Sequence, residues 1–227
     1  MSVIKAEKIK KIYQETAVPV HALNGVDITI EAGEFTAIVG PSGCGKTTLL
    51  NILGGLDHPT EGKVVIDNTN ITDMKDSKLI DFRLQNIGFV FQAYNLIPVL
   101  TSKENVEFIM LLQKKDKAER DKRAMSLLEE MGIADKANQR PSELSGGQQQ
   151  RVAVARALAS KPKVILADEP TANLDSKSTE NLLDMMAQLN KEESATFVFS
   201  THDQRVIDKA KRIVTLEDGV IISDVSK

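Results

Sequence analysis

The chain has 227 residues and a mass of 24.9 kDa, which suits one large domain or a core with an inserted lobe. Hydrophobic residues make up 41% and charged residues 27%, with 13 glycines and 7 prolines, so collagen-like and intrinsically disordered chains are excluded. A net charge of -3 and a pI near 5.7 give the chain no overall attraction for nucleic acid or anionic lipid, and no nucleic-acid partner is expected.

The cysteine content and the N-terminal residues indicate the compartment. Cys44 has no second cysteine with which to form an intramolecular disulfide. The first thirty residues contain lysines but no apolar signal core. We therefore expect a cytoplasmic protein.

The first forty residues are predicted to form β structure that leads into a loop and a helix. Apolar residues alternate with polar ones over residues 26–30, and an apolar run over residues 35–39 ends at a glycine. From Lys46 the apolar residues recur at helical spacing. Further short strands are expected at residues 63–66 and 87–91.

The longest stretch without a charged side chain covers residues 84–102. Its 19 residues approach the roughly 20 that a helix needs to cross a bilayer. The stretch contains Gln85, Asn86, Gln92 and Asn95, however, and polar groups are costly in hydrocarbon. We expect no membrane span there, so the stretch needs another role.

The middle of the chain is predicted to be an inserted helical lobe, because residues 101–132 are helical in pattern and heavily charged and residues 149–160 form another helix. Residues 114–123 hold six basic and three acidic side chains. Because the signs are mixed, this run is interpreted as the solvated face of a charged helix rather than as a nucleic-acid or lipid contact.

The C-terminal part alternates strand, helix and strand. The strands are expected at residues 164–167 and 196–199, with a helix over residues 176–189 between them. This order implies parallel strands joined by crossover helices. Asp218 and Gly219, which stand between two apolar runs, predict a terminal hairpin.

Residues 40–47 match the pattern GxxxxGK[ST] between an apolar strand and a helix, as a phosphate loop requires. Glycines in such a loop let backbone N–H groups point at phosphate oxygens, and the helix N-terminus adds about half a positive charge. Lys46 is expected to bridge the β- and γ-phosphates and Thr47 to ligate Mg²⁺. The predicted nucleotide-binding residues are Gly40, Pro41, Ser42, Gly43, Cys44, Gly45, Lys46, Thr47 and Thr48.

Of two interpretations of Cys44, a redox switch and a small residue in the loop, we favour the second.

A second carboxylate motif follows the apolar strand at residues 164–167. A buried parallel strand delivers Asp168 and Glu169 to its C-terminal edge, where ligands of open α/β sheets bind. Asp168 is predicted to lie on the Mg²⁺ side. Glu169 is predicted to polarise the attacking water as a general base.

Two further motifs are not general to phosphate-loop proteins. Residues 144–148 read Leu-Ser-Gly-Gly-Gln before a helix, and Gln92 follows a strand. These match the signature and the Q-loop of the ATP-binding cassette (ABC) family, and the chain resembles a nucleotide-binding domain of that family over essentially its whole length. The resemblance implies an α/β fold: a P-loop core with a mostly parallel sheet, an N-terminal antiparallel β subdomain and an inserted α-helical lobe. As one ABC ATPase domain, its core would cover residues 1–93 and 162–227, with the signature lobe at about 94–161.

The resemblance also implies roles for residues outside the loop. Tyr13 would stack on adenine, Asp175 would belong to the D-loop at residues 173–175, and His202 would be the switch histidine. Gln92 would contact water and Mg²⁺ and act as the hinge of the lobe. The residues expected to act in catalysis are Glu169, His202, Lys46 and Gln92, and those expected to bind the metal are Thr47, Gln92 and Asp168. His21 and His58 lie in no motif and are interpreted as structural.

The signature motif implies a second copy of the chain. Ser145, Gly146 and Gly147, followed by Gln148, head a helix and form another anion-binding N-terminus. One γ-phosphate cannot reach two such helix ends unless a second lobe or chain brings the other. The family resemblance implies a head-to-tail homodimer in which ATP lies between the phosphate loop of one subunit and residues 145–148 of the other.

Three classes of protein use a phosphate loop of this kind. The first is the energy-coupling subunit of a membrane transporter, and the second is a soluble cassette ATPase acting on ribosomes or DNA. A P-loop kinase or GTPase is the third, but it does not explain residues 144–148, and no guanine-reading NKxD motif is present. Soluble cassette ATPases generally carry two cassettes or a long coiled-coil insertion, and neither is visible here, so the first class is favoured.

Within transporters, residues 89–98 and 140–143 most resemble the bacterial macrolide-exporter and lipoprotein-release ATPases, with an importer ATPase as the alternative. The expected partners are a second copy, an integral membrane permease contacted through the Gln92 region, and an extracytoplasmic adaptor reached through the permease. The expected location is the cytoplasmic face of the plasma membrane. Residues 84–102, which include Gln92, are the expected docking surface.

Overall fold

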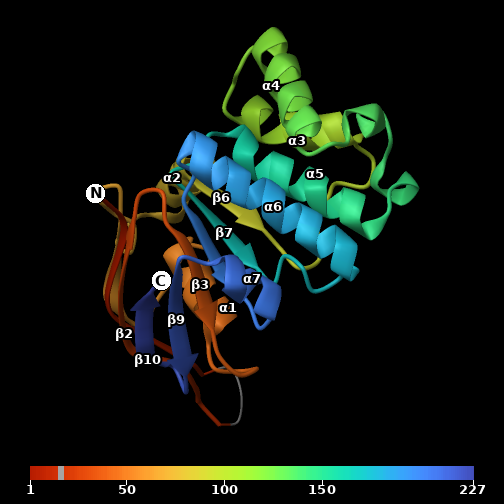
Figure 1. Ribbon diagram of the computed structural model, residues 1–227. Helices are drawn as coiled ribbons and strands as arrows, with labels where there is room; N and C mark the ends of the chain where they lie inside the picture. The colour runs from red at the N-terminus through yellow and green to blue at the C-terminus, as the bar shows by residue number, and fades with distance from the viewer. Residues whose placement is uncertain (15–17) are drawn as a thin grey trace.

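The computed structural model describes residues 1–14 and 18–227, arranged as two sheets and a set of helices (Figure 1). The strands are β1 Ser2–Tyr13, β2 Val20–Glu31, β3 Phe35–Val39, β4 Glu61–Ile66, β5 Thr69–Asn70, β6 Ile87–Val90, β7 Val164–Asp168, β8 Phe197–Ser200, β9 Arg212–Glu217 and β10 Val220–Ser226. The α-helices are α1 Lys46–Leu53, α2 Asp76–Asn86, α3 Ser102–Leu112, α4 Lys117–Glu130, α5 Gly146–Ala159, α6 Ser176–Glu193 and α7 Gln204–Lys209. Two short 3-10 helices are η1 Ala134–Lys136 and η2 Pro141–Glu143.

The N-terminal β structure is an antiparallel sheet with the strand order β2-β1-β4-β5. Buried and more exposed residues alternate along its strands because one face of the sheet is covered. Ile4, Ala6, Ile28 and Ile30 are inaccessible to solvent or nearly so. The predicted antiparallel β subdomain is therefore confirmed for the described residues. Residues 15–17, which the prediction of β structure also covered, lie outside them.

The second sheet has six strands in the order β10-β9-β3-β8-β7-β6. β6, β7, β8, β3 and β9 run parallel, which brings their C-terminal ends to one edge. β10 pairs antiparallel with β9 across Asp218 and Gly219, as the hairpin prediction required. The predicted α/β class is confirmed.

The central strands of the six-stranded sheet, β3, β8 and β7, are buried on both faces. Phe35, Phe197 and Phe199 pack on one face against α5 and α6, with the ring centroids of Phe35 and Phe199 4.6 Å apart. Ile38 and Val198 point to the opposite face, where α1 and the antiparallel sheet cover them. This two-sided core holds the strand ends, and the loops that follow them, in fixed positions.

The inserted lobe contains α3, α4 and α5, which lie together in Figure 1. The helical stretch predicted over residues 101–132 is two helices, because Lys114 has φ 61° and Asp116 caps a new helix by accepting a hydrogen bond from the backbone of Glu119. The helix predicted from residue 149 begins at Gly146, since Ser145 is its N-cap. The division into core and lobe at residues 94–161 stays a prediction.

Residues 84–102 do not form a continuous helix. They contain the end of α2, all of β6 and a loop that leads to α3. Among the described residues, no helix has both the length and the apolar character needed to cross a membrane.

Candidate functional site

The phosphate-loop pattern folds as a tight turn between β3 and α1. Gly45 precedes α1 with φ 104°, and a Cβ added there would lie 2.4 Å from the carbonyl oxygen of Ala22. Gly40 has φ 151°, and its Cβ would lie 2.0 Å from the carbonyl oxygen of Leu216. Neither position can hold a side chain, so both glycines are required for the loop to close against its neighbours.

Lys46, the first residue of α1, is held over this loop. Its side chain is only slightly exposed, and Nζ donates to the carbonyl oxygens of Gly40 at 2.8 Å and Pro41 at 2.9 Å. Two neutral carbonyls do not neutralise the ammonium group. The loop therefore carries a fixed positive charge next to the N-terminus of α1, and this suits a phosphate chain.

Thr47 and Asp168 form a hydroxyl-carboxylate pair at the end of β7. Thr47 Oγ1 donates to both carboxylate oxygens of Asp168, at 3.0 and 3.1 Å. Among the side chains that the structure describes, no cluster of three His, Cys, Asp or Glu residues has the geometry of a metal site. The Thr47 hydroxyl and the Asp168 carboxylate nevertheless fit Mg²⁺, because this ion uses few protein oxygens and completes its coordination shell with phosphate and water.

Glu169 follows Asp168 in a strained backbone conformation. Its φ is 45°, a value uncommon for a residue with a side chain, and its N–H donates to the carbonyl oxygen of Ser200 at 2.9 Å. Its Oε1 lies 2.8 Å from Nδ1 of His202, and Thr201 Oγ1 donates to Oε2 at 3.5 Å. The backbone conformation and these hydrogen bonds together hold the Glu169 carboxylate in one orientation, against Thr201 and His202.

A cavity of about 800 Å³ brings most of the predicted site residues together. Its lining includes Tyr13, Gln92, Glu169 and His202. The loop residues that line it are Gly40, Pro41, Ser42, Gly43, Gly45, Lys46, Thr47 and Thr48. His21, which lies in no motif and was interpreted as structural, also lines this cavity.

Tyr13 is held at the cavity by two residues that sequence analysis did not single out. Its hydroxyl donates to Asp57 Oδ2 at 2.8 Å, and Lys11 Nζ lies 4.8 Å from the centre of its ring. Lys11 also donates to Asp57 Oδ1 at 2.6 Å. Burial acts to raise the pKa of Asp57, but the hydrogen bonds from Lys11 and Tyr13 outweigh it and hold this pKa below its ordinary value.

Residues 145–148 and Asp175 do not line the cavity. Ser145 Oγ accepts from the N–H of Gln148 at 3.3 Å and caps α5, with Gly146 and Gly147 in its first turn. Asp175 caps α6, and hydrogen bonds from the hydroxyl and N–H of Ser178 hold the pKa of Asp175 below its ordinary value. Both motifs thus stabilise helix N-termini within their own chain.

Cys44 packs behind the loop. The side chain is 4% exposed and belongs to the core between the two sheets, and its Sγ lies 3.9 Å from Lys46 Nζ. A Cβ at Gly40 would lie 2.8 Å from this sulfur. Cys44 therefore occupies a small space that the loop leaves against the core.

The loop after Gln92 is tied to α5 by contacts that the sequence did not reveal. Arg156 donates to the carbonyl oxygens of Asn95 at 2.5 Å and Tyr94 at 2.9 Å, and Asn173 Nδ2 donates to the carbonyl oxygen of Gln92 at 2.9 Å. Burial lowers the pKa of Arg156. An arginine within the apolar pattern of α5 was the one signal in the sequence that could have indicated this contact.

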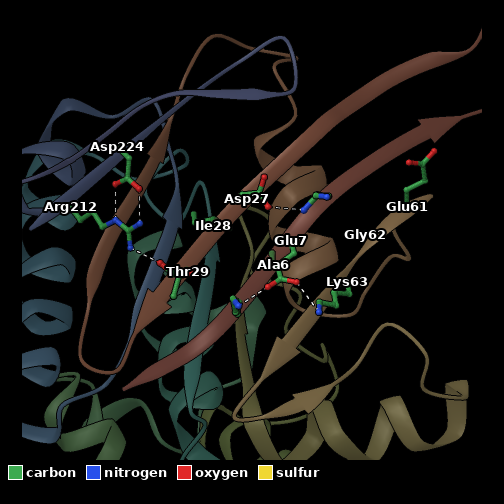
Figure 2. A pocket seen from close by; sticks show the side chains of 12 residues that line it. Ala6, Glu7, Asp27, Ile28, Thr29, Glu61, Gly62, Lys63, Arg212 and Asp224 are labelled. Carbon is green, nitrogen blue, oxygen red and sulfur yellow. Dashed lines mark hydrogen bonds and ion pairs between the residues drawn. The ribbon is translucent and has the colours of Figure 1, made fainter.

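A larger cavity, of about 910 Å³, lies between the antiparallel sheet and the terminal hairpin (Figure 2). Two groups of its charged residues form ion pairs with one another. Glu7 binds Lys5 at 2.6 Å and Lys63 at 2.8 Å, and these hydrogen bonds lower the pKa of Glu7 to about 2. Arg212 pairs with Asp224 at 2.7 Å. None of the predicted site residues lines this cavity, so we assign it no function.

The chain is similar to known proteins over its whole length. The family profile described as ABC transporter matches residues 23–172. An uncharacterized ABC transporter ATP-binding protein of Methanocaldococcus jannaschii is 47% identical over 224 residues, which cover 99% of this chain and 100% of that protein. The macrolide export ATP-binding/permease protein MacB of Mannheimia succiniciproducens is 44% identical over 227 residues, which cover 100% of this chain but 35% of that protein.

Solved structures agree with the fold. The dimeric ATP-binding cassette MJ0796, a Methanocaldococcus jannaschii protein, was solved in a post-hydrolysis state bound to ADP and Pi. This cassette matches the chain with a TM-score of 0.91 and 45% identity, over 98% of each chain.

Proposed function

The chain belongs to the ABC transporter family, and from this premise we propose that it drives a separate membrane subunit of the macrolide-exporter or lipoprotein-release type. It is an ATP-binding subunit that binds ATP with Mg²⁺ and hydrolyses ATP. The proposed work is the export or extraction of envelope substrates such as peptides, lipoproteins or antibiotics. The 44% identity with MacB supports this group over an importer ATPase.

The observation that carries the proposal is the cavity in which the phosphate loop, Gln92, Glu169 and His202 meet. When bound beside Thr47 and Asp168, Mg²⁺ supplies positive charge to the phosphate oxygens. Lys46 stabilises the charge on the γ-phosphate. Glu169 accepts the proton of the water that attacks the γ-phosphorus as the bond to the bridging oxygen breaks, and His202 orients the Glu169 carboxylate. Gln92 positions the water and the metal.

Adenine is proposed to stack on Tyr13. Asp57 and Lys11 fix the Tyr13 ring, and a fixed ring loses little conformational entropy when a base stacks on it. His21 lies on the wall of the same cavity. A Tyr13→Ala variant is expected to bind ATP more weakly without a change in the rate of hydrolysis at saturation.

A homodimer is proposed to complete the site. Residues 145–148 are absent from the cavity lining of the single chain, yet they form a helix N-terminus of the kind that binds anions. Two copies arranged head to tail give each nucleotide both helix ends. The dimeric state described for the related cassette supports this arrangement.

The membrane subunit is proposed to dock in an apolar groove of about 440 Å³ beside the Gln92 loop. Ile80 and Leu56, which line the groove, are 55% and 41% exposed. Phe89, Phe91 and Ile97, all from residues 84–102, line it as well. An apolar face of a cytoplasmic helix would cover these side chains, and the docking would hold the chain at the cytoplasmic face of the plasma membrane. An extracytoplasmic adaptor is proposed to join through the permease.

The test is co-expression with the permease encoded by the neighbouring reading frame, followed by purification through a tag on the permease. A four-span permease with a large extracytoplasmic domain that retains this chain and raises its ATPase activity supports the proposal. If the neighbouring frame is a six-span permease beside a solute-binding protein, importer function replaces it. Association with ribosomes or DNA in place of membranes would support the soluble class.

A further inference from the structure

We propose that a basic cavity next to the apolar groove receives carboxylates of the same membrane subunit, an inference that rests on the proposed docking of that subunit. The cavity measures about 400 Å³ and lies between α4, the turn before it and the end of α5. Its charged lining residues are Lys115, Glu119, Lys122, Arg123 and Lys161. Four cations thus surround one carboxylate on a chain whose net charge is -3.

The two cavities are adjacent. Ser160 lines both of them. On α2, Leu84 lines the apolar groove and the next residue, Gln85, lines the basic cavity. On α3, Ile109 lines the apolar groove and the next residue, Met110, lines the basic cavity. A helix that lies in the groove and extends past Ser160 therefore meets the basic cavity, so one partner can fill both.

Within the mixed run at residues 114–123, the acidic side chains have partners inside the lobe. Asp121 pairs with Lys103 on α3, and Asp116 accepts the backbone N–H of Glu119 as the cap of α4. The carboxylate of Glu119 pairs with Lys115 at 3.1 Å. The acidic side chains of the run are therefore engaged within the lobe.

Two cations of the cavity have no partner among the side chains that the structure describes. Lys122 and Lys161 make no side-chain hydrogen bond or ion pair within that part of the chain. Folding the chain gathers these charges without compensating them, so the cavity keeps a positive potential. A carboxylate placed there is attracted to both ammonium groups and leaves no buried charge unpaired.

The adjacency of the groove and the basic cavity favours a carboxylate of the docking helix over a lipid phosphate. A helix anchored in the groove presents its own side chains to the cavity, and the second contact is then intramolecular for the partner and costs little additional entropy. We infer that the docking helix is apolar on one face and acidic at the end that lies against α4 and Lys161.

The test compares co-purification of the neighbouring permease with the wild-type chain and with the double variant Lys122→Glu/Lys161→Glu. Opposing like charges are costly, so we expect the double variant to bind the permease roughly tenfold more weakly. Lys117→Glu, on α4 but outside the cavity, is the matched control and should bind as the wild type does. Basal ATPase activity should be unchanged in all three. Exchange of the permease carboxylates for lysine should restore binding to the double variant.

Two further experiments distinguish failure of the docking proposal from failure of the basic-cavity inference. Ile80→Asp places a charge in the apolar groove; if it leaves permease binding intact, the docking proposal itself is wrong. If Ile80→Asp abolishes binding and Lys122→Glu/Lys161→Glu does not weaken it, the docking proposal stands and the basic-cavity inference is overturned. Phosphatidylglycerol vesicles that bind the wild type but not the double variant, while permease binding is equal for both, would identify a lipid phosphate as the occupant and overturn the inference as well.

Discussion

Nδ1 of His202 lies 2.8 Å from Oε1 of Glu169, although 33 positions separate the two residues in the chain. They meet because β7 and β8 are adjacent parallel strands, with Asp168 paired to Ser200, and both strands end at the same edge of the sheet. A carboxylate can only accept, so the His202 ring donates through Nδ1 in this contact. The pair joins a proposed general base to a side chain that holds it in position.

Glu169→Gln is expected to bind ATP and to lose nearly all turnover. The amide keeps the shape of the carboxylate but cannot accept a proton, and loss of a general base lowers the rate by about 10² to 10⁴-fold. ATP should accumulate in a stable dimer, which gel filtration with ATP and Mg²⁺ would detect. Hydrolysis at the wild-type rate would remove Glu169 from the base role.

Ser145→Arg is expected to block ATP-dependent dimerisation while the monomer still binds nucleotide. The cationic side chain fills the space at the N-terminus of α5 where the partner's phosphate is proposed to lie. Because the change also removes the N-cap, which contributes about 1 kcal/mol to helix stability, Ser145→Ala serves as the control for loss of the cap alone. Sedimentation with ATP checks the result, and wild-type ATPase activity in Ser145→Arg would contradict the composite site.

Gly146→Ala is expected to destabilise the chain only when Tyr94 keeps its hydroxyl. A Cβ at Gly146 would lie 2.7 Å from Tyr94 Oη, which also donates to the carbonyl oxygen of Asn173 at 3.5 Å. Tyr94→Phe removes the clashing atom, so the two substitutions should couple by at least about 0.5 kcal/mol in a double-mutant cycle. Urea unfolding of the four proteins measures this coupling. Additive effects would show that the two side chains do not share this space in solution.

Asp203→Asn is expected to destabilise the chain at neutral pH and to have less effect in acid. The Arg205 side chain, followed by hydrogen bonds from the Arg205 backbone and Thr171, outweighs burial and holds the pKa of Asp203 below 3.8. A carboxyl with a depressed folded-state pKa contributes stability above its unfolded pKa, and this contribution is lost as the pH falls through the folded value.

The check on Asp203 compares urea unfolding of the wild type and Asp203→Asn at several pH values. The difference in free energy of unfolding should be constant above about pH 5 and should shrink as the pH falls below 3.8. Asp184→Asn, which alters an exposed ion pair with Lys209, is a control that should have a small effect at every pH. A difference for Asp203→Asn that does not depend on pH would contradict the assignment.

Local patterns in the sequence were sufficient to predict the phosphate loop, the two acids at the end of β7 and the order of strands and helices. Each depends on residues adjacent in the chain: the turn at Gly45 needs a residue tolerant of positive φ, and Asp168 follows four buried residues. The exceptions were local too. Helix α5 begins at Gly146 and not at the predicted residue 149, because Ser145 is its N-cap and a capping side chain decides where a helix begins.

The sequence by itself determined the family and the α/β class, and it predicted most of the residues that meet in the cavity of about 800 Å³, since their chemistry is carried by short contiguous motifs. Only the tertiary structure decided which distant residues support them. Asn173 reaches the carbonyl of Gln92 across 81 positions, and Asp57 reaches Tyr13 across 44. The basic cavity depends equally on the fold, because Lys103 on α3 pairs with Asp121 of the mixed run, while Lys122 and Lys161 have no partner among the described side chains. Such pairings depend on how separate elements pack in space, which no local spacing of residues encodes.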